Sequence, residues 1–205
     1  LTGELLSVDL GPGLLGQIYD GLQNPLERLA IETGRFLNRG IEIDALDDKI
    51  LWGFKAEARV GQLLKAGDIL GTVQEGRFTH KVMVPQHMTG AVEVIWIQEG
   101  SFTVETVIAK VRDANDEEHA LTMKQRWPVR VPFTQNILDE GRSERLYPSE
   151  PLITSSRIID TFFPIAHGGT ACIPGPFGAG KTVLQHLISR YSNVDIVIVV
   201  ACGER

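Results

Sequence analysis

Residues 175–182 carry the strongest chemical signal in the chain, because Gly-Pro-Phe-Gly-Ala-Gly-Lys-Thr matches the phosphate-binding pattern G-x-x-x-x-G-K-[ST]. Lys181 would place its ammonium against the β- and γ-phosphates, and the Thr182 hydroxyl would bind Mg²⁺. The three glycines are expected to allow positive φ and to keep side chains away from the phosphates. The pattern therefore predicts a nucleoside triphosphate site. Its candidate binding residues are Gly175, Pro176, Phe177, Gly178, Ala179, Gly180, Lys181, Thr182 and Val183.

The sequence on both sides of this loop supports the same interpretation. An apolar stretch at 170–174 predicts a strand that enters the loop, and residues 183–188 have helical periodicity. A strand, a glycine loop and a helix together aim backbone N–H groups at a polyphosphate. Pro176 has no N–H, so the donors should come mostly from 177–182. A purely structural glycine-rich turn is the alternative, which these flanks disfavour.

A second set of residues follows the apolar run 194–202, which is typical of a parallel strand buried on both faces. In open α/β sheets, ligands gather at the carboxyl ends of the strands, where Glu204 and Arg205 stand here. Glu204 could polarise a water for in-line attack, and Arg205 could balance the developing charge. An exposed Glu-Arg pair that begins a loop is the alternative. Cys172 and Cys202 fall in the two expected strands, which favours reduced, buried thiols over a disulfide.

Composition excludes several classes of protein. The chain has 205 residues, a net charge of −6 and no Lys/Arg cluster, which argues against a nucleic-acid surface. The longest apolar run, 196–202, is too short to cross a membrane, and no signal peptide is visible at the start. Two parallel strands alone cannot bury both faces of a sheet, and the chain begins with Leu1. We therefore expect it to be a piece of a longer protein.

Two further regions have their own patterns. Residues 14–39 are expected to be helical, with Asn24 as N-cap, Pro25 at the first helical position and Gly34 at the end. From about 50 to 111, glycine turns separate short β segments, as in a small barrel or sandwich. The strand candidates are 50–58, 69–73, 81–84, 91–97 and 102–111. We expect a charged connection at 113–119, an irregular segment at 126–151 and helical or mixed structure at 155–165.

The β segments resemble the barrel-sandwich shape of lipoyl and biotinyl carriers, so a swinging-arm carrier is one alternative. A carrier needs a modifiable lysine at an exposed hairpin tip. Lys49 precedes the first expected strand, Lys81 lies within one, and Lys124 follows the last. This arrangement favours a structural or docking insertion that carries no cofactor.

Several motifs together resemble the catalytic A subunit of rotary V-type and archaeal-type ATPases. The resemblance spans essentially the whole chain. An inserted β module and a Pro-Phe pair in the loop distinguish this branch from the F-type catalytic subunits. The motifs are 10–23, Pro-Leu-Ile-Thr at 151–154, Arg-Ile-Ile-Asp-Thr-Phe-Phe-Pro at 157–164, Gly-Gly-Thr at 168–170, the loop, and Cys-Gly-Glu-Arg at 202–205. His167 departs from the family, which often has Lys or Arg there.

The resemblance implies an α/β fold: a truncated RecA-like P-loop nucleotide-binding domain interrupted by an inserted all-β barrel-sandwich module, the bulge. Residues 1–10 would end an amino-terminal β-barrel, 11–45 and 126–205 would form the nucleotide-binding domain, and 46–125 the bulge. Lys181, Glu204 and Arg205 would be catalytic, with Thr182 on Mg²⁺ and ATP or ADP in the loop.

The resemblance also implies partners and an activity. B subunits would alternate with this subunit in a hexameric ring that contacts a central shaft and peripheral stalk. The head would be cytoplasmic and peripheral on the membrane, coupling ATP hydrolysis or synthesis to proton or sodium transport. We expect this stretch alone to be inactive, since the partner supplies an arginine finger. A non-catalytic ring subunit and another RecA-like motor are the alternatives, and the intact loop, Glu204 and the β insertion disfavour them.

Overall fold

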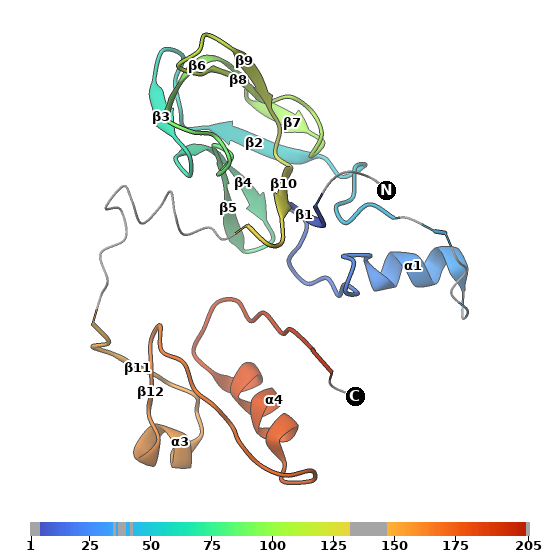
Figure 1. Ribbon diagram of the computed structural model, residues 1–205, viewed down its shortest axis with the longest axis vertical. Coiled ribbons are helices and arrows are strands. Elements are labelled where there is room, and N and C mark those ends of the chain that lie inside the picture. The colour runs from blue at the N-terminus through green and yellow to red at the C-terminus, as the bar shows by residue number, and fades with distance from the viewer. Residues whose placement is uncertain (1–4, 35, 37–39, 42, 132–146, 204–205) are drawn as a thin grey trace. The chain divides into compact units, whose positions relative to one another are not determined.

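The computed structural model describes residues 5–34, 36, 40, 41, 43–131 and 147–203 (Figure 1). The chain divides into two compact units, Leu1–Ile137 and Leu138–Arg205. The first unit contains almost all of the β structure, and the second contains the glycine loop and its helix. No helix in the described ranges combines the length and apolar character needed to span a bilayer.

Two antiparallel four-stranded sheets make up most of the first unit. One sheet has the order β5-β4-β2-β7 and the other β3-β6-β8-β9 (Figure 1). The strands of the first sheet are β2 Trp52–Ala56, β4 Ile69–Glu75, β5 Phe78–Met83 and β7 Gly100–Phe102. Those of the second are β3 Leu63–Lys65, β6 Ala91–Ile97, β8 Ala109–Arg112 and β9 Glu118–Leu121.

Alternation of side chains along the strands builds the core of these sheets. In β6, Val92 and Val94 are buried while Glu93 between them is only half-buried, as expected when successive residues face opposite sides of a sheet. Two buried apolar clusters result, and Ile97 packs against both of them. The prediction of an all-β barrel-sandwich module is therefore confirmed. Gly67, Gly76 and Gly90 have positive φ at the turns where the sequence places breaks.

Several strand boundaries differ from those expected. Residues 102–111 are not one strand: β7 ends at Phe102, and Thr103 and Thr106 close a turn through hydroxyls 2.9 Å apart. The expected charged connection at 113–119 overlaps the start of β9, because the Asp113 carboxylate accepts backbone N–H groups and reverses the chain before Glu118. Strand β3 has three residues with one buried side chain, too short to give a visible alternation.

The expectation of irregular structure from residue 126 onward is wrong for residues 126–128, which belong to a strand together with Gln125. They form β10, Gln125–Pro128, which pairs antiparallel with β1, Ser7–Leu10. The backbone of Asp9 in β1 is also bonded to the side-chain amide of Gln23. The amide oxygen accepts the Asp9 N–H at 2.7 Å, and the amide nitrogen donates to the Asp9 carbonyl at 2.8 Å. Pairing across more than a hundred residues leaves no local pattern in the sequence.

Helix α1, Leu26–Thr33, is shorter than the expected 14–39. Pro25 takes the N-cap position, one residue later than expected, because the Asn24 side chain is bonded to Asp20 instead. Gly34 ends the helix as expected, with φ of 71° and its N–H on the Ala30 carbonyl. Leu29 is the one buried residue of α1. Positions 35 and 37–39 lie outside the described residues.

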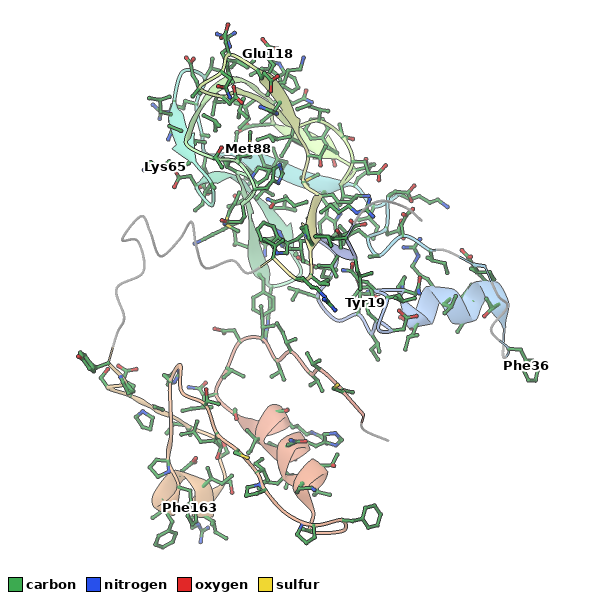
Figure 2. The ribbon with its side chains drawn as sticks, viewed as in Figure 1. Tyr19, Phe36, Lys65, Met88, Glu118 and Phe163 are labelled. Carbon is green, nitrogen blue, oxygen red and sulfur yellow. The ribbon has the colours of Figure 1, made fainter. Side chains whose placement is uncertain are left out.

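The second unit contains two short strands and two helices: β11 Pro151–Leu152, α3 Arg157–Phe162, β12 Ile165–Ala166 and α4 Lys181–Tyr191. Strands β11 and β12 are paired antiparallel. The end of α4 is fixed to residues 153–155, since the Asn193 N–H donates to the Ile153 carbonyl and the Ser155 hydroxyl to the Tyr191 carbonyl. Figure 2 shows Phe163, just after α3, pointing away from the ribbon.

The predictions of buried strands at 170–174 and 194–202 are wrong for this structure. In the described part of the second unit, β11 and β12 are the only paired strands, and 194–200 lie exposed. Cys172 and Cys202 are consequently exposed free thiols rather than buried ones. A strand needs hydrogen bonds to a neighbour, and apolar composition alone does not supply one.

A local network in this unit predicts a dependence on pH. The Asp160 carboxylate accepts the Thr154 hydroxyl at 2.7 Å and its N–H at 3.0 Å, and the hydroxyl bond is the larger cause that lowers the pKa of Asp160. The stabilisation is present above the ordinary carboxyl pKa of 3.8 and is lost as pH falls through the lower folded value. Thr154→Val should raise the Asp160 midpoint in a carboxyl ¹³C titration. An unchanged Asp160 midpoint would show that the Thr154 hydroxyl does not lower the pKa of Asp160.

Candidate nucleotide site

The glycine loop runs directly into helix α4. Gly180 is the N-cap residue, in the left-handed region with φ of 81°, and Gly178 has φ of 79°. A side chain would strain the backbone at both positions, as the sequence pattern predicts. Gly175 differs from the prediction because its φ is not positive. It is needed for space instead, since a Cβ there would lie 3.1 Å from Cβ of Ala179.

Lys181 is the first residue of α4 and folds back over the loop. Its Nζ donates to the Gly175 carbonyl oxygen at 2.5 Å, and the residue is half-buried. The Leu184 N–H bonds to the Gly180 carbonyl at 3.0 Å, so the helical ladder begins at the end of the loop. The positive end of the helix dipole and the ammonium thus lie at the same end of α4. This combination favours an anion such as a phosphate.

The remaining candidate residues lie along the same continuous segment. Phe177 is at the outer side of the loop and 93% exposed, while Thr182 is half-buried at the start of α4. The Ala179 N–H donates to the Pro176 carbonyl at 3.3 Å, which closes the turn between them. Residues 175–183 thus form the loop and the first turn of α4, and their role as nucleotide ligands stays a prediction. A Mg²⁺ ligand role fits the position and chemistry of Thr182, whose hydroxyl is a hard oxygen donor.

Glu204 and Arg205 lie outside the described residues. Gly203, the last described residue, has φ of 67°. The catalytic roles of the two charged residues therefore stay predictions.

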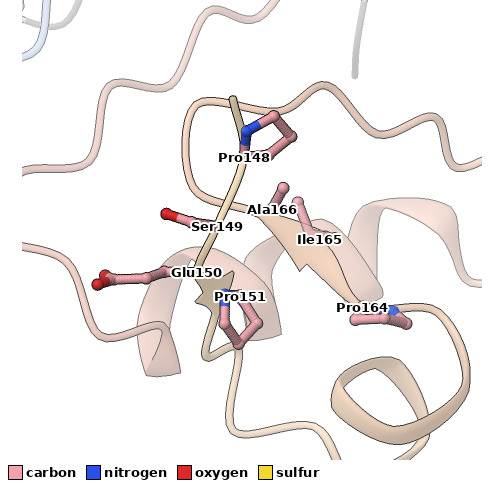
Figure 3. A pocket seen from close by; sticks show the side chains of 7 residues that line it. All are labelled: Pro148, Ser149, Glu150, Pro151, Pro164, Ile165 and Ala166. Carbon is pink, nitrogen blue, oxygen red and sulfur yellow. The ribbon is translucent and has the colours of Figure 1, made fainter. Parts of the chain in front are cut away.

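A shallow pocket of about 230 Å³ lies between β11 and β12, away from the loop (Figure 3). Figure 3 shows the Ser149 and Glu150 side chains extending to one side and Ile165 and Ala166 lying on the other. Its rim is fixed by the His167 N–H, which donates to the Glu150 carbonyl at 2.9 Å. The pocket contains no residue of the glycine loop. It is lined by Pro148, Ser149, Glu150, Pro151, Pro164, Ile165 and Ala166.

One group of side chains in the first unit has the composition of a metal site. Ligand atoms of Asp113, Glu117 and His119 lie within 4.8 Å of one another. Asp113 is already engaged, because one carboxylate oxygen accepts two backbone N–H groups and the other lies 3.2 Å from His119 Nε2. These bonds shape the β8–β9 turn, and they also lower the pKa of Asp113. The turn explains the group without a metal.

Sequence reasoning missed one buried carboxylate. Glu75 is 7% exposed and is the last residue of β4, directly before the turn at Gly76. Its partners are backbone N–H groups some sixty positions earlier, which carry no side-chain pattern. A charged residue beside a glycine is ordinary in a turn, so nothing in the sequence marked it.

Each of the two structural units contains a region that matches a known protein family. Residues 43–130 match the ATP synthase alpha/beta subunit barrel-sandwich domain, and 155–205 match the nucleotide-binding domain of the ATP synthase alpha/beta family. The V-type ATP synthase alpha chain 1 of Treponema pallidum (strain Nichols) is 56% identical over all 205 residues. V-type ATP synthase alpha chains of Treponema denticola and Borrelia turicatae are 54% and 52% identical over the same span.

The chain spans 34% of the length of each of these relatives. The similarity covers the β module, the glycine loop and α4 without interruption. Both matching models describe one family, and the relatives agree with them. The chain therefore belongs to the ATP synthase alpha/beta family, of which it carries the barrel-sandwich domain and part of the nucleotide-binding domain.

Proposed function

We propose that this chain forms the bulge and P-loop part of the catalytic A subunit of a rotary V-type ATPase or ATP synthase. One observation carries the proposal: a complete P-loop at the start of α4, in a chain similar throughout to V-type ATP synthase alpha chains. The whole subunit would bind Mg-ATP or Mg-ADP. It would couple ATP hydrolysis or synthesis to proton or sodium transport.

Four side chains have distinct roles in this proposal. Lys181 binds the β- and γ-phosphates and Thr182 binds Mg²⁺, with residues 175–183 surrounding the phosphates. Glu204 orients and polarises the attacking water, and Arg205 stabilises the charge that develops beside it. A carboxylate in this position raises the rate by removing a proton from water as the bond to phosphorus forms.

The division of the chain follows from the same proposal. Residues 1–10 end an amino-terminal β-barrel, 11–45 and 126–205 belong to the nucleotide-binding domain, and 46–125 are the inserted bulge. The two ends of such an insertion must lie close together. In support, a Cβ on Gly11 would lie 2.9 Å both from Leu46 Cδ1 and from the Met123 carbonyl oxygen, near the two ends of the insertion.

The proposed partners are B subunits, which would alternate with this subunit in a hexameric ring, together with central-shaft and peripheral-stalk subunits. The head would lie in the cytoplasm and reach the membrane only through the complex. The bulge would be a rigid outward projection that meets the stator stalk and carries no cofactor. Lys81, one of the lysines considered for a carrier role, lies within β5 rather than at a hairpin tip.

Lys181→Ala in the full-length protein tests the proposed site. Removing a charged hydrogen-bond donor costs about 1.5–3 kcal/mol, so we expect the Kd for Mg-ATP to rise roughly 10- to 100-fold. Equilibrium binding of a fluorescent ATP analogue measures this. Lys110→Ala, an exposed lysine on β8, is the matched control and should leave the Kd unchanged. A Kd within threefold of the unmodified protein after Lys181→Ala would refute the phosphate role.

The 205-residue chain by itself should show no steady-state ATP hydrolysis. A partner's arginine finger alone accounts for about 10³–10⁵ in rate in related phosphoryl transfer, and the single chain has no partner. A coupled-enzyme assay with Mg-ATP measures the turnover. Turnover above roughly 1 s⁻¹, which is within the ordinary enzyme range, would contradict the proposed need for the ring.

A further inference from the structure

Glu75 is the one buried charged residue among those that the structure describes, and it lies outside the nucleotide site. A carboxylate removed from water is costly unless charge-assisted hydrogen bonds replace its hydration. Its position at the end of β4, next to Gly76, would let a turn residue point outward to solvent at no cost. The side chain instead points into the protein, so its partners must compensate for burial.

The partners are backbone amides from a distant turn. One oxygen of Glu75, Oε1, accepts the N–H of Gly13 at 2.7 Å and that of Leu15 at 3.2 Å. Two N–H groups from nearby positions that converge on one oxygen form a backbone anion nest. Gly13 has φ of 109°, a conformation that a glycine adopts without strain and that helps aim both groups at the same point.

The second carboxylate oxygen and the packing around the turn hold this arrangement. Oε2 of Glu75 lies 3.0 Å from Nδ1 of His80, which projects from the neighbouring strand β5. Behind the turn, Pro12 and Leu46 are almost completely buried. Both oxygens are therefore engaged, and the nest is part of a packed region rather than a loose loop.

Tyr19 shows that the charge of Glu75 acts further along the same segment. Burial is the largest cause that raises the pKa of Tyr19, Arg28 lowers it, and the Glu75 charge raises it again. The Tyr19 hydroxyl donates to the Ala45 carbonyl at 3.0 Å, immediately before Leu46 (Figure 2). The Glu75 charge thus acts on Tyr19 as well as on the amides of Gly13 and Leu15.

We propose that the turn 13–15 is an anion-binding site whose ligand is the Glu75 carboxylate, and that this bond is the polar latch fixing the β4–β5 hairpin to the segment that leads into α1. The latch joins two parts of the chain that are separated by some sixty residues. It does not depend on the proposed function. If that function holds, the latch connects the bulge to the nucleotide-binding domain at a point distinct from the covalent ends of the insertion.

Amide hydrogen exchange in the 205-residue chain, resolved by NMR, tests the latch. In Glu75→Ala the Gly13 and Leu15 amides should exchange about tenfold or more faster, while the Val94 amide, bonded to the Gln62 carbonyl within the module, keeps its rate. Glu75→Gln keeps one oxygen acceptor and should give a smaller increase. Glu57→Gln, an exposed glutamate after β2, is the matched control and should change none of these rates.

Two further measurements test the latch even if the Glu75→Ala variant does not fold. In the unmodified chain, the Gly13 and Leu15 amides should be protected from exchange, and unprotected amides there would overturn the proposal. Glu75→Gln should also lower the Tyr19 midpoint in an NMR titration, because it removes a negative charge that raises this pKa. If rates at Gly13 and Leu15 stay within threefold in every folded Glu75 variant, the latch does not exist.

Discussion

Glu204→Gln in the full-length protein is expected to abolish most ATP hydrolysis while leaving nucleotide binding intact. The amide keeps the shape of the side chain but cannot remove a proton from the attacking water, and general-base catalysis contributes about 10²–10⁴ in rate. Binding should survive because, in the proposed site, Lys181 and the loop amides would hold the phosphates in the ground state as well as in the transition state. Steady-state hydrolysis and equilibrium binding of Mg-ATP, measured on the same preparation, separate the two effects.

The contrast with Lys181→Ala sharpens this expectation. That variant should lose binding and rate together, whereas Glu204→Gln should lose rate alone. Glu57→Gln, on the β module, is the matched control for loss of one carboxylate and should do neither. If Glu204→Gln leaves the hydrolysis rate within a few-fold, the water-activating role is wrong. Another carboxylate of the subunit would then have to polarise the water.

The nucleotide loop was predictable from the sequence because its geometry is local. The left-handed conformations of Gly178 and Gly180 and the position of Lys181 at the first turn of α4 all follow from neighbours within a few residues. The alternation in β6 was readable for the same reason. Gly175 shows how far such a prediction reaches. The pattern predicts that a glycine is required at this position, but it does not say whether a positive φ or a lack of space for a side chain requires it.

Features that depend on distant partners could not be read in this way. Whether 170–174 and 194–202 form strands depends on neighbours to pair with, and their apolar composition says nothing of that. The pairing of β1 with β10, and of Glu75 with Gly13, joins residues far apart in the chain. Gln23 is a similar case, because only the fold brings its amide to Asp9. One sequence without aligned homologues contains no record of such pairs.

The β module makes its own quantitative prediction, from two glycines in neighbouring strands. Gly71 in β4 is buried, and a Cβ there would meet the Lys55 carbonyl oxygen and lie 2.5 Å from Phe54 Cζ. Gly53 in β2 is exposed, and a Cβ there would have no heavy atom within 4 Å apart from its own chain neighbours. The same substitution to alanine should therefore have opposite effects at the two positions.

Gly71→Ala should lower the free energy of unfolding by about 3 kcal/mol, at the upper end for overpacking. Backbone cannot move aside as a flexible side chain does, and Phe54 is only 2% exposed, in a core that is expected to be closely packed. Gly53→Ala should raise the free energy of unfolding by about 0.5 kcal/mol, since alanine loses less conformational entropy than glycine when the strand forms. Urea unfolding followed by tryptophan fluorescence, to which Trp52 and Trp96 of the β module contribute, measures both changes, and the m-value should stay unchanged. Equal effects at both positions would mean that β2 and β4 do not pack as the register of Ala56 against Gly71 requires.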